Sequence, residues 1–160
     1  MGVYPTGARV DWGLMAKRKK NILSINTEMV PGWLKEYFPE PGKSLPQWRA
    51  NVLIPYVLER DTVCWVEDCW HNISDVHEGI ITRGDVQGWA NKYRILIHNP
   101  VNCIGLCKDC HRFYPERRDV LLWMVNEYGL WVLDWYEKLP FKHNPISGLI
   151  EEAKQLYERE

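Results

Sequence analysis

Residues 99–113 read NPVNCIGLCKDCHRF and contain three of the five cysteines in the 160-residue chain. Cys107 and Cys110 are separated by two residues, a spacing at which one short turn can present two thiolates to the same metal ion. A second short-spaced pair, Cys64 and Cys69, lies upstream. The fold therefore depends on whether the two pairs come together.

Four thiolates from two such pairs can close one tetrahedral zinc site, and soft thiolate ligands favour zinc. A metal cross-link of this kind adds folding free energy directly to a small domain. The alternatives are four unconnected cysteines, or a redox pair at Cys107 and Cys110, against which the second pair counts. The spacing predicts a structural Zn²⁺ held by Cys64, Cys69, Cys107 and Cys110. Cys103 is expected to be a buried apolar residue.

The composition is that of one folded domain with an added arm, at 46% hydrophobic and 26% charged residues and a net charge of −1. The nine tryptophans are expected to fill the core, with stacking on unpaired bases as the alternative. Basic residues gather locally at 17–20 and 108–118. Such patches can bind phosphate even though the whole chain has no basic field.

No stretch of the sequence approaches the length of a transmembrane helix, and the first residues lack the apolar core of a signal peptide. We therefore expect no membrane partner and an intracellular, cytoplasmic location. In that reducing compartment, short-spaced cysteines indicate a metal site rather than disulfides.

The distribution of Pro, Gly and apolar residues divides the chain into three parts. Residues 1–45 are rich in Pro and Gly, which predicts an irregular N-terminal arm. Residues 46–128 are expected to form the metal-binding domain. Residues 129–160 are expected to form a C-terminal helical extension.

Within these parts the patterns favour an α+β class. A helix is expected from Pro46, with a kink or restart at Pro55. Strands are expected over 73–82 and 93–98. A further helix over 116–128 is expected to end at Gly129.

Between and around the cysteine pairs, the chain resembles the zinc-bearing HNH endonucleases. Their pattern is a Cys pair, a strand ending in a His-rich dipeptide, a loop, and a segment of the form N-L-x-x-L-C-x-x-C-H. Here His77 follows the first pair, and residues 102–111 read NCIGLCKDCH, with Cys103 in place of the usual Leu. The resemblance covers about residues 60–115. It implies a ββα-metal (HNH) core and a phage or prophage origin.

The resemblance implies a metal-dependent endonuclease that hydrolyses phosphodiester bonds in DNA, by nicking or by double-strand cutting. Hydrolysis needs a deprotonated water and a cation that stabilises the developing charge. A neutral imidazole is a suitable base near pH 7. By resemblance, His111 binds the catalytic ion, which is Mg²⁺ or another hard divalent ion, and Asn102 braces the strand and orients the base.

The resemblance leaves the role of His77 open, because many family members carry an acidic residue or a His followed by a second His. If His77 takes the first place it is a metal ligand and Glu78 is the base. If it takes the second place it is the base, and Val76 cannot bind metal. Strand alternation places Asp75 on the same face as His77, so Asp75 is a further candidate ligand. The candidate catalytic residues are thus His77, Glu78, Asn102 and His111.

Phosphate contacts are expected from basic side chains around this core, namely Arg83, Lys108, Arg112, Arg117 and Arg118. The segment from Arg83 to Asp85 is also expected to form a turn, and His71, His98 and His143 are expected to be surface or core residues. The alternative function is a non-catalytic zinc module that binds DNA or a protein partner, the latter through the Trp-rich flanking segments.

Overall fold

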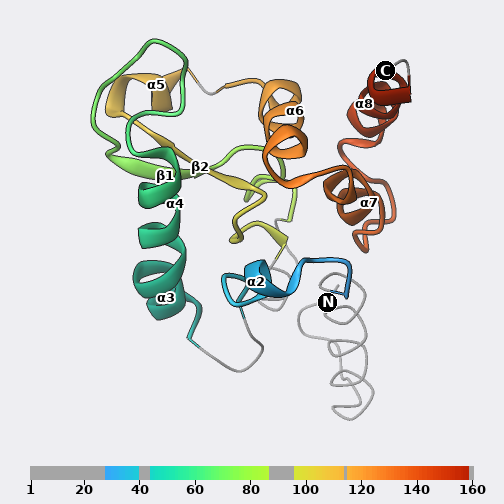
Figure 1. The fold of residues 1–160 in the computed structure, drawn as a ribbon, viewed down its shortest axis with the longest axis horizontal. Coiled ribbons are helices and arrows are strands. Elements are labelled where there is room, and N and C mark those ends of the chain that lie inside the picture. Colours follow the sequence, from blue (N-terminus) through green and yellow to red (C-terminus); the bar gives the residue numbers. More distant parts are fainter. Residues whose placement is uncertain (1–27, 40–43, 87–95, 114, 159–160) are drawn as a thin grey trace.

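The computed structural model describes residues 28–39, 44–86, 96–113 and 115–158 (Figure 1). It is a mixed fold in which helices surround a two-stranded antiparallel sheet made of β1 (Asp75–Glu78) and β2 (Cys103–Leu106). The expected combination of helices with a small β region is therefore confirmed. Residues 1–27 and 40–43 of the expected N-terminal arm, which include the basic run at 17–20, lie outside the described residues.

Helices make up about half of the described chain. They are α2 (Gly32–Lys35), α3 (Leu45–Trp48), the π-helix η1 (Arg49–Leu53), α4 (Ile54–Asp61), α5 (Lys108–Arg112), α6 (Arg117–Tyr128), α7 (Trp131–Glu137) and α8 (Ser147–Glu158). The expected end of α6 at Gly129 is confirmed, because Gly129 follows the helix with a φ of 117°, a value that L side chains rarely adopt.

The helix expected from Pro46 is present as α3, η1 and α4, which follow one another directly along the chain (Figure 1). Ser44 caps its start, with its hydroxyl accepting from the Gln47 N–H at 3.5 Å. The π-helical segment ends at Leu53, two residues before Pro55. A wider turn accommodates a ring that has no N–H to donate, so the interruption expected at Pro55 takes the form of a π turn.

The sheet is shorter than the sequence patterns indicate, and its second strand lies elsewhere. In the register, Asp75 pairs with Leu106 and Glu78 with Cys103. The strand expected over 93–98 is wrong for residues 96–98, where the backbone forms a turn, and residues 93–95 lie outside the described part. The carbonyl of Ile97 accepts hydrogen bonds from the Asn102 amide and the Cys103 thiol instead of from a neighbouring strand.

The two faces of the sheet pack against different groups of residues. On one face, Val76 and Cys103 pack with Trp48, Leu53 and Val57 of the first helical segment. Ile104 and Leu106 belong to the main core, together with buried residues of α6, α7 and α8. Helix α5 packs against both strands, and α4 packs against β2 (Figure 1). The hairpin and α5 thus form one structural unit.

A part-buried ion pair at the end of α4 is hydrogen-bonded to β2. Arg60 pairs with Asp61 at 2.7 Å and donates to the carbonyls of Pro100 and Cys103 at 2.7 and 2.6 Å. The Asp61 carboxylate in turn accepts from the Gly105 N–H at 2.8 Å. These bonds fix the position of β2 and of the loop that precedes it.

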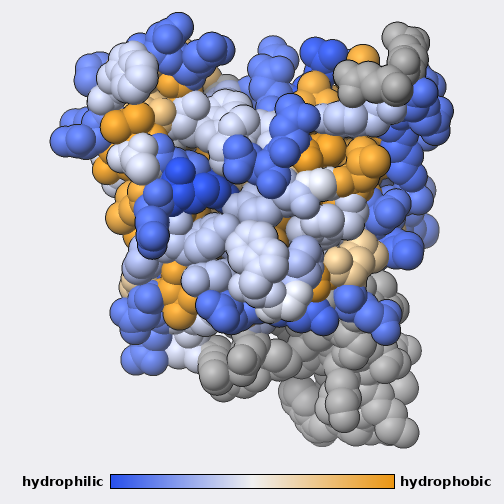
Figure 2. Space-filling view, viewed as in Figure 1, coloured by the Kyte–Doolittle hydropathy of each residue, from blue (hydrophilic) through white to orange (hydrophobic). Residues whose placement is uncertain are grey.

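The face of the molecule in Figure 2 is mostly hydrophilic, and its hydrophobic residues lie in separate patches. Trp33, Trp70 and Phe113 are among the large hydrophobic residues that are exposed, at 60%, 74% and 83%. None of the helices in the described ranges has the length and apolar character needed to cross a membrane.

Candidate metal centre and active site

The four cysteines of the two pairs meet at one place. All of their sulfur atoms lie within 4.8 Å of one another, and Cys69 Sγ is 3.6 Å from Cys107 Sγ and 3.7 Å from Cys110 Sγ. A tetrahedral zinc ion with Zn–S bonds of about 2.3 Å requires sulfur–sulfur distances of about 3.8 Å. The four side chains could therefore hold a metal ion, and their spacing and chemistry are consistent with a structural zinc.

Local structure prepares these sulfurs for a metal. Cys107 is the N-cap of α5, and its Sγ accepts from the Cys110 N–H at 3.4 Å. This hydrogen bond is the main reason that the pKa of Cys107 falls to about 6, which favours the thiolate form at this sulfur. Cys103 is separate from the cluster. It is 1% exposed, and burial raises its pKa to about 12, which confirms the expected buried residue.

The sequence patterns did not single out His71 as part of this centre. Its Nδ1 lies 3.4 Å from Cys69 Sγ. The signal that could have found it is its position two residues after Cys69, although an exposed histidine near a cysteine is not a specific pattern.

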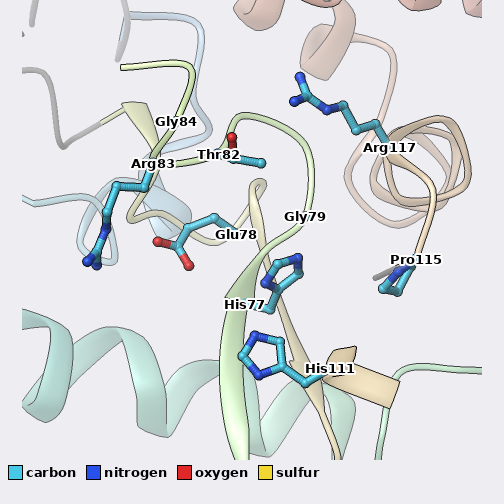
Figure 3. Close-up of a pocket in the computed structure, with 9 residues that line it drawn as sticks. All are labelled: His77, Glu78, Gly79, Thr82, Arg83, Gly84, His111, Pro115 and Arg117. Carbon is cyan, nitrogen blue, oxygen red and sulfur yellow. The ribbon is translucent and has the colours of Figure 1, made fainter. Parts of the chain in front are cut away.

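A second cluster lies on the face of the hairpin that carries α5. His77 of β1 and His111 of α5 have ring centroids 5.1 Å apart, at an interplanar angle of 64°. The Asp75 carboxylate lies 3.3 Å from His111 Nδ1. Figure 3 shows the two imidazoles side by side, one from each element. The structure therefore brings His111 to Asp75 and His77, two predicted site residues more than thirty positions earlier in the sequence.

The electrostatics of this cluster keep one imidazole neutral. Burial, and then repulsion by His111, lowers the pKa of His77 from 6.5 to about 4, against the opposing pull of Asp75. At neutral pH His77 is therefore a neutral imidazole, the form that can bind a metal or accept a proton.

Glu78 is placed apart from the histidines. It lies opposite Cys103 in the register, so its side chain emerges on the other face of the sheet, where it raises the pKa of the Cys103 thiol. Its carboxylate points away from the two imidazoles in Figure 3, although it contributes to the lining of the same pocket.

Asn102 is fully buried and bonded to the chain around it. Its Nδ2 donates to the carbonyls of Ile81 and Ile97 at 2.8 and 2.9 Å. Its Oδ1 accepts from the Ile81 N–H at 2.8 Å and from the Tyr136 hydroxyl at 3.0 Å. These bonds hold the two ends of the inter-strand loop together and attach them to α7. Tyr136 is a member of this network that the sequence did not reveal.

The histidines open onto a pocket of about 650 Å³. Its lining is His77, Glu78, Gly79, Thr82, Arg83, Gly84, His111, Pro115 and Arg117 (Figure 3). Gly79 is needed in this lining because a Cβ there would lie 2.9 Å from a methyl group of Val120. The pocket thus combines two imidazoles with two guanidinium groups at its rim.

The basic residues predicted to contact phosphate fall into three groups. Arg83 and Arg117 line the pocket, and Arg117 is paired with Asp85 at 3.0 Å. Asp85 also accepts from the Thr82 N–H at 2.8 Å, which confirms the turn expected at this point. Arg118 pairs with Glu152 at 2.7 Å on the surface, away from the pocket lining. Lys108 and Arg112 are exposed on α5.

Among the described residues, only the four cysteines have ligand atoms that converge closely enough for the protein alone to hold an ion. Asp75, His77 and His111 form a looser group. Comparison of the chain with protein-family models, with curated proteins and with solved structures finds no match. A functional assignment therefore depends on the geometry of the two clusters.

Proposed function

We propose that the chain is a metal-dependent HNH-type endonuclease that hydrolyses phosphodiester bonds in DNA, with β1, β2 and α5 as its ββα-metal unit and a structural Zn²⁺ at the four cysteines. The observation that carries this proposal is the meeting of Asp75, His77 and His111 next to the cysteine cluster, with both imidazoles lining an open pocket. A purely structural metal site needs none of these three side chains.

Asp75 and His111 are the proposed ligands of the catalytic ion. Their facing atoms are 3.3 Å apart, close to the separation of about 2.9 Å between neighbouring ligands of an octahedral Mg²⁺. Mg²⁺ commonly takes one or two protein ligands and completes its shell with water and phosphate oxygens. A site of this kind does not require three converging protein ligands. A bound ion supplies charge stabilisation to the developing phosphate charge and the leaving oxygen.

His77 is the proposed general base, because it is neutral at pH 7 and lines the same pocket as His111. The negative charge of a bound phosphodiester would raise the proton affinity of its ring. Glu78 is the alternative base, and its position on the opposite face of the strand disfavours it. Asn102 acts through the loop, by holding the segment that carries Thr82 and Arg83.

The DNA backbone would approach over the pocket rim and the exposed face of α5. Arg83, Lys108 and Arg112 are the proposed phosphate contacts. Arg117 would contribute a guanidinium that Asp85 orients, with part of its charge already balanced. Because the total charge of the chain is −1, binding should depend on this local patch and weaken steeply with added salt.

The test is nicking of supercoiled plasmid by purified, zinc-loaded protein with Mg²⁺ or Mn²⁺, and with chelator. At saturating ion, His77→Ala should slow nicking by about 10²–10⁴-fold, the usual contribution of a general base. Asp75→Asn and His111→Ala should raise the ion concentration required. His143→Ala, an exposed histidine between α7 and α8, is the matched control.

Glu78→Gln resolves the question of the base. It should leave nicking within a few-fold of wild type, whereas loss of nicking in Glu78→Gln with retention in His77→Ala would assign the base to Glu78. Folded, zinc-loaded protein that nicks with neither ion would favour a non-catalytic zinc module that binds DNA or a protein partner. The exposed Trp70 and Phe113 beside the cysteine cluster would then be the first candidate partner contacts.

A further inference from the structure

His71 lies against the four-cysteine cluster at several points. Its Nδ1 is 3.4 Å from Cys69 Sγ, and its carbonyl accepts from the Cys64 N–H at 2.9 Å. One residue outside the expected ligand set therefore contacts two of the four cysteines.

The backbone around Cys69 is shaped to produce this contact. Asp68 and Trp70, on either side of Cys69, both have a φ of 63°, a left-handed conformation that residues other than glycine rarely adopt. The Trp70 side chain is 74% exposed, so packing of its indole does not account for the strained turn. The turn reverses the chain and returns the imidazole of His71 to the sulfur of Cys69.

When zinc is bound by the four cysteines, the charge on their sulfurs determines which atom donates in the hydrogen bond between His71 Nδ1 and Cys69 Sγ. Four thiolates around one divalent ion leave a net negative charge, and a coordinated thiolate can only accept. The 3.4 Å approach therefore requires the proton to lie on His71 Nδ1. A hydrogen bond to an ionised acceptor is stronger than one between neutral groups. Cys69 is also only partly buried, so its sulfur is more accessible to reagents than those of Cys64 and Cys107.

We propose that His71 completes the zinc centre from outside the ligand set: its Nδ1–H donates to Cys69 Sγ, which keeps that thiolate on the ion and lowers its reactivity. His71 is a positioning residue and not a fifth ligand. The role requires only a metal at the four cysteines, so it holds whether or not the chain is a nuclease.

The test compares full-length, zinc-loaded wild type with His71→Ala, His71→Gln and the control His143→Ala. Zinc transfer to a colorimetric chelator and alkylation by iodoacetamide, mapped by mass spectrometry, are the two measurements. Loss of a partner that orients a metal ligand lowers metal affinity by about 10–100-fold, so His71→Ala should release zinc faster by a similar factor. Its first alkylated residue should be Cys69. His71→Gln keeps an N–H donor and should lie between His71→Ala and wild type.

Cobalt substitution separates an outer donor from a direct ligand. The absorption bands of Co²⁺ bound by four thiolates should be the same in wild type and in His71→Ala. A change from a mixed sulfur–nitrogen spectrum in wild type to a four-sulfur spectrum in the variant would overturn the outer role. Equal zinc release and alkylation in all four proteins would overturn the hydrogen bond.

His71 is exposed, so its replacement should not disturb the core. Whether each variant folds with zinc therefore also tests the proposal. If His71→Ala fails to fold with zinc while His71→Gln folds, the N–H donor is supported. If both fail, a role limited to hydrogen-bond donation is excluded.

Discussion

Replacement of Asn102 by Ala should destabilise the protein severely, because its side chain satisfies three buried backbone groups at once. These are the N–H and carbonyl of Ile81 and the carbonyl of Ile97. A buried polar group left without a partner costs about 1–3 kcal/mol. Tyr136 loses one partner but retains the Val101 carbonyl at 2.6 Å, so it adds little.

The Ile97 carbonyl keeps the Cys103 thiol at 3.2 Å, so the two groups of Ile81 would cost about 2–6 kcal/mol if nothing replaced the amide. Each carbonyl has two lone pairs, and a water molecule that entered the vacated space would recover part of the loss. We therefore expect the lower end of this range, a loss of about 2–3 kcal/mol in the free energy of unfolding. Because a domain of this kind is stable by only about 5–15 kcal/mol in total, the variant should be near the limit of folding.

The assay is urea unfolding in saturating zinc, followed by tryptophan emission. Asn51→Ala is the control, since Asn51 is exposed on η1 and its loss should change the unfolding free energy by less than about 0.5 kcal/mol. A loss below about 1 kcal/mol for Asn102→Ala, with an unchanged m-value, would show that the loop does not depend on this amide. Wild-type stability combined with lost nicking would instead give Asn102 a direct role in catalysis.

Three further predictions concern the ion pair of Arg60, the imidazole of His77 and the cysteine cluster. Arg60→Met should lower the free energy of unfolding in urea by about 3–5 kcal/mol, because it leaves the nearly inaccessible Asp61 carboxylate without its charged partner. Adding Asp61→Asn should recover part of that loss. As the pH is lowered from 6.5 to about 4, thermal stability should fall, because the pKa of His77 is 6.5 in the unfolded chain, which then binds more protons than the folded one. His77→Gln should flatten this dependence of stability on pH. An unchanged dependence in the variant would assign it to other groups. Chelation of zinc should abolish the near-ultraviolet dichroism of the tryptophans, whereas a spectrum unaffected by complete metal removal would show that the four cysteines do not support the fold.

Local spacing in the sequence was sufficient to predict the cysteine cluster and the end of α6. The end of α6 and the spacing within each cysteine pair depend on residues a few positions apart, where geometry follows from the chain itself, whereas the meeting of the two pairs was inferred from the coordination number of zinc. Alternation along β1 likewise placed Asp75 and His77 on one face, and both contact His111 in the structure. The contact between β1 and α5 could be predicted only from the family resemblance, because no local rule relates residues more than thirty positions apart.

The position of β2 could not be predicted in the same way. All four of its residues are buried, so the strand has no alternation of apolar and polar side chains. Gly105 lowers its strand propensity further, yet it is required, because a Cβ there would lie 2.5 Å from the Ile73 side chain. The hydrogen-bond partners of Asn102 could not be predicted from the sequence for a related reason. Ile81 and Tyr136 are 21 and 34 residues away, and an Asn beside Pro100 resembles an ordinary turn residue.

The two metal sites proposed for this chain depend on the same short helix. Helix α5 has five residues, fewer than an isolated helix needs to be stable in water. Cys107 caps it and Cys110 lies within it, so a metal bound by these sulfurs fixes the helix at two points directly before His111. Asp75, the other proposed ligand, is held through β2, where the Ser74 N–H donates to the Leu106 carbonyl at 2.9 Å. The structural ion would thus set the distance between the two ligands of the catalytic ion. Loss of the first ion should therefore disable the second site without altering any of its residues.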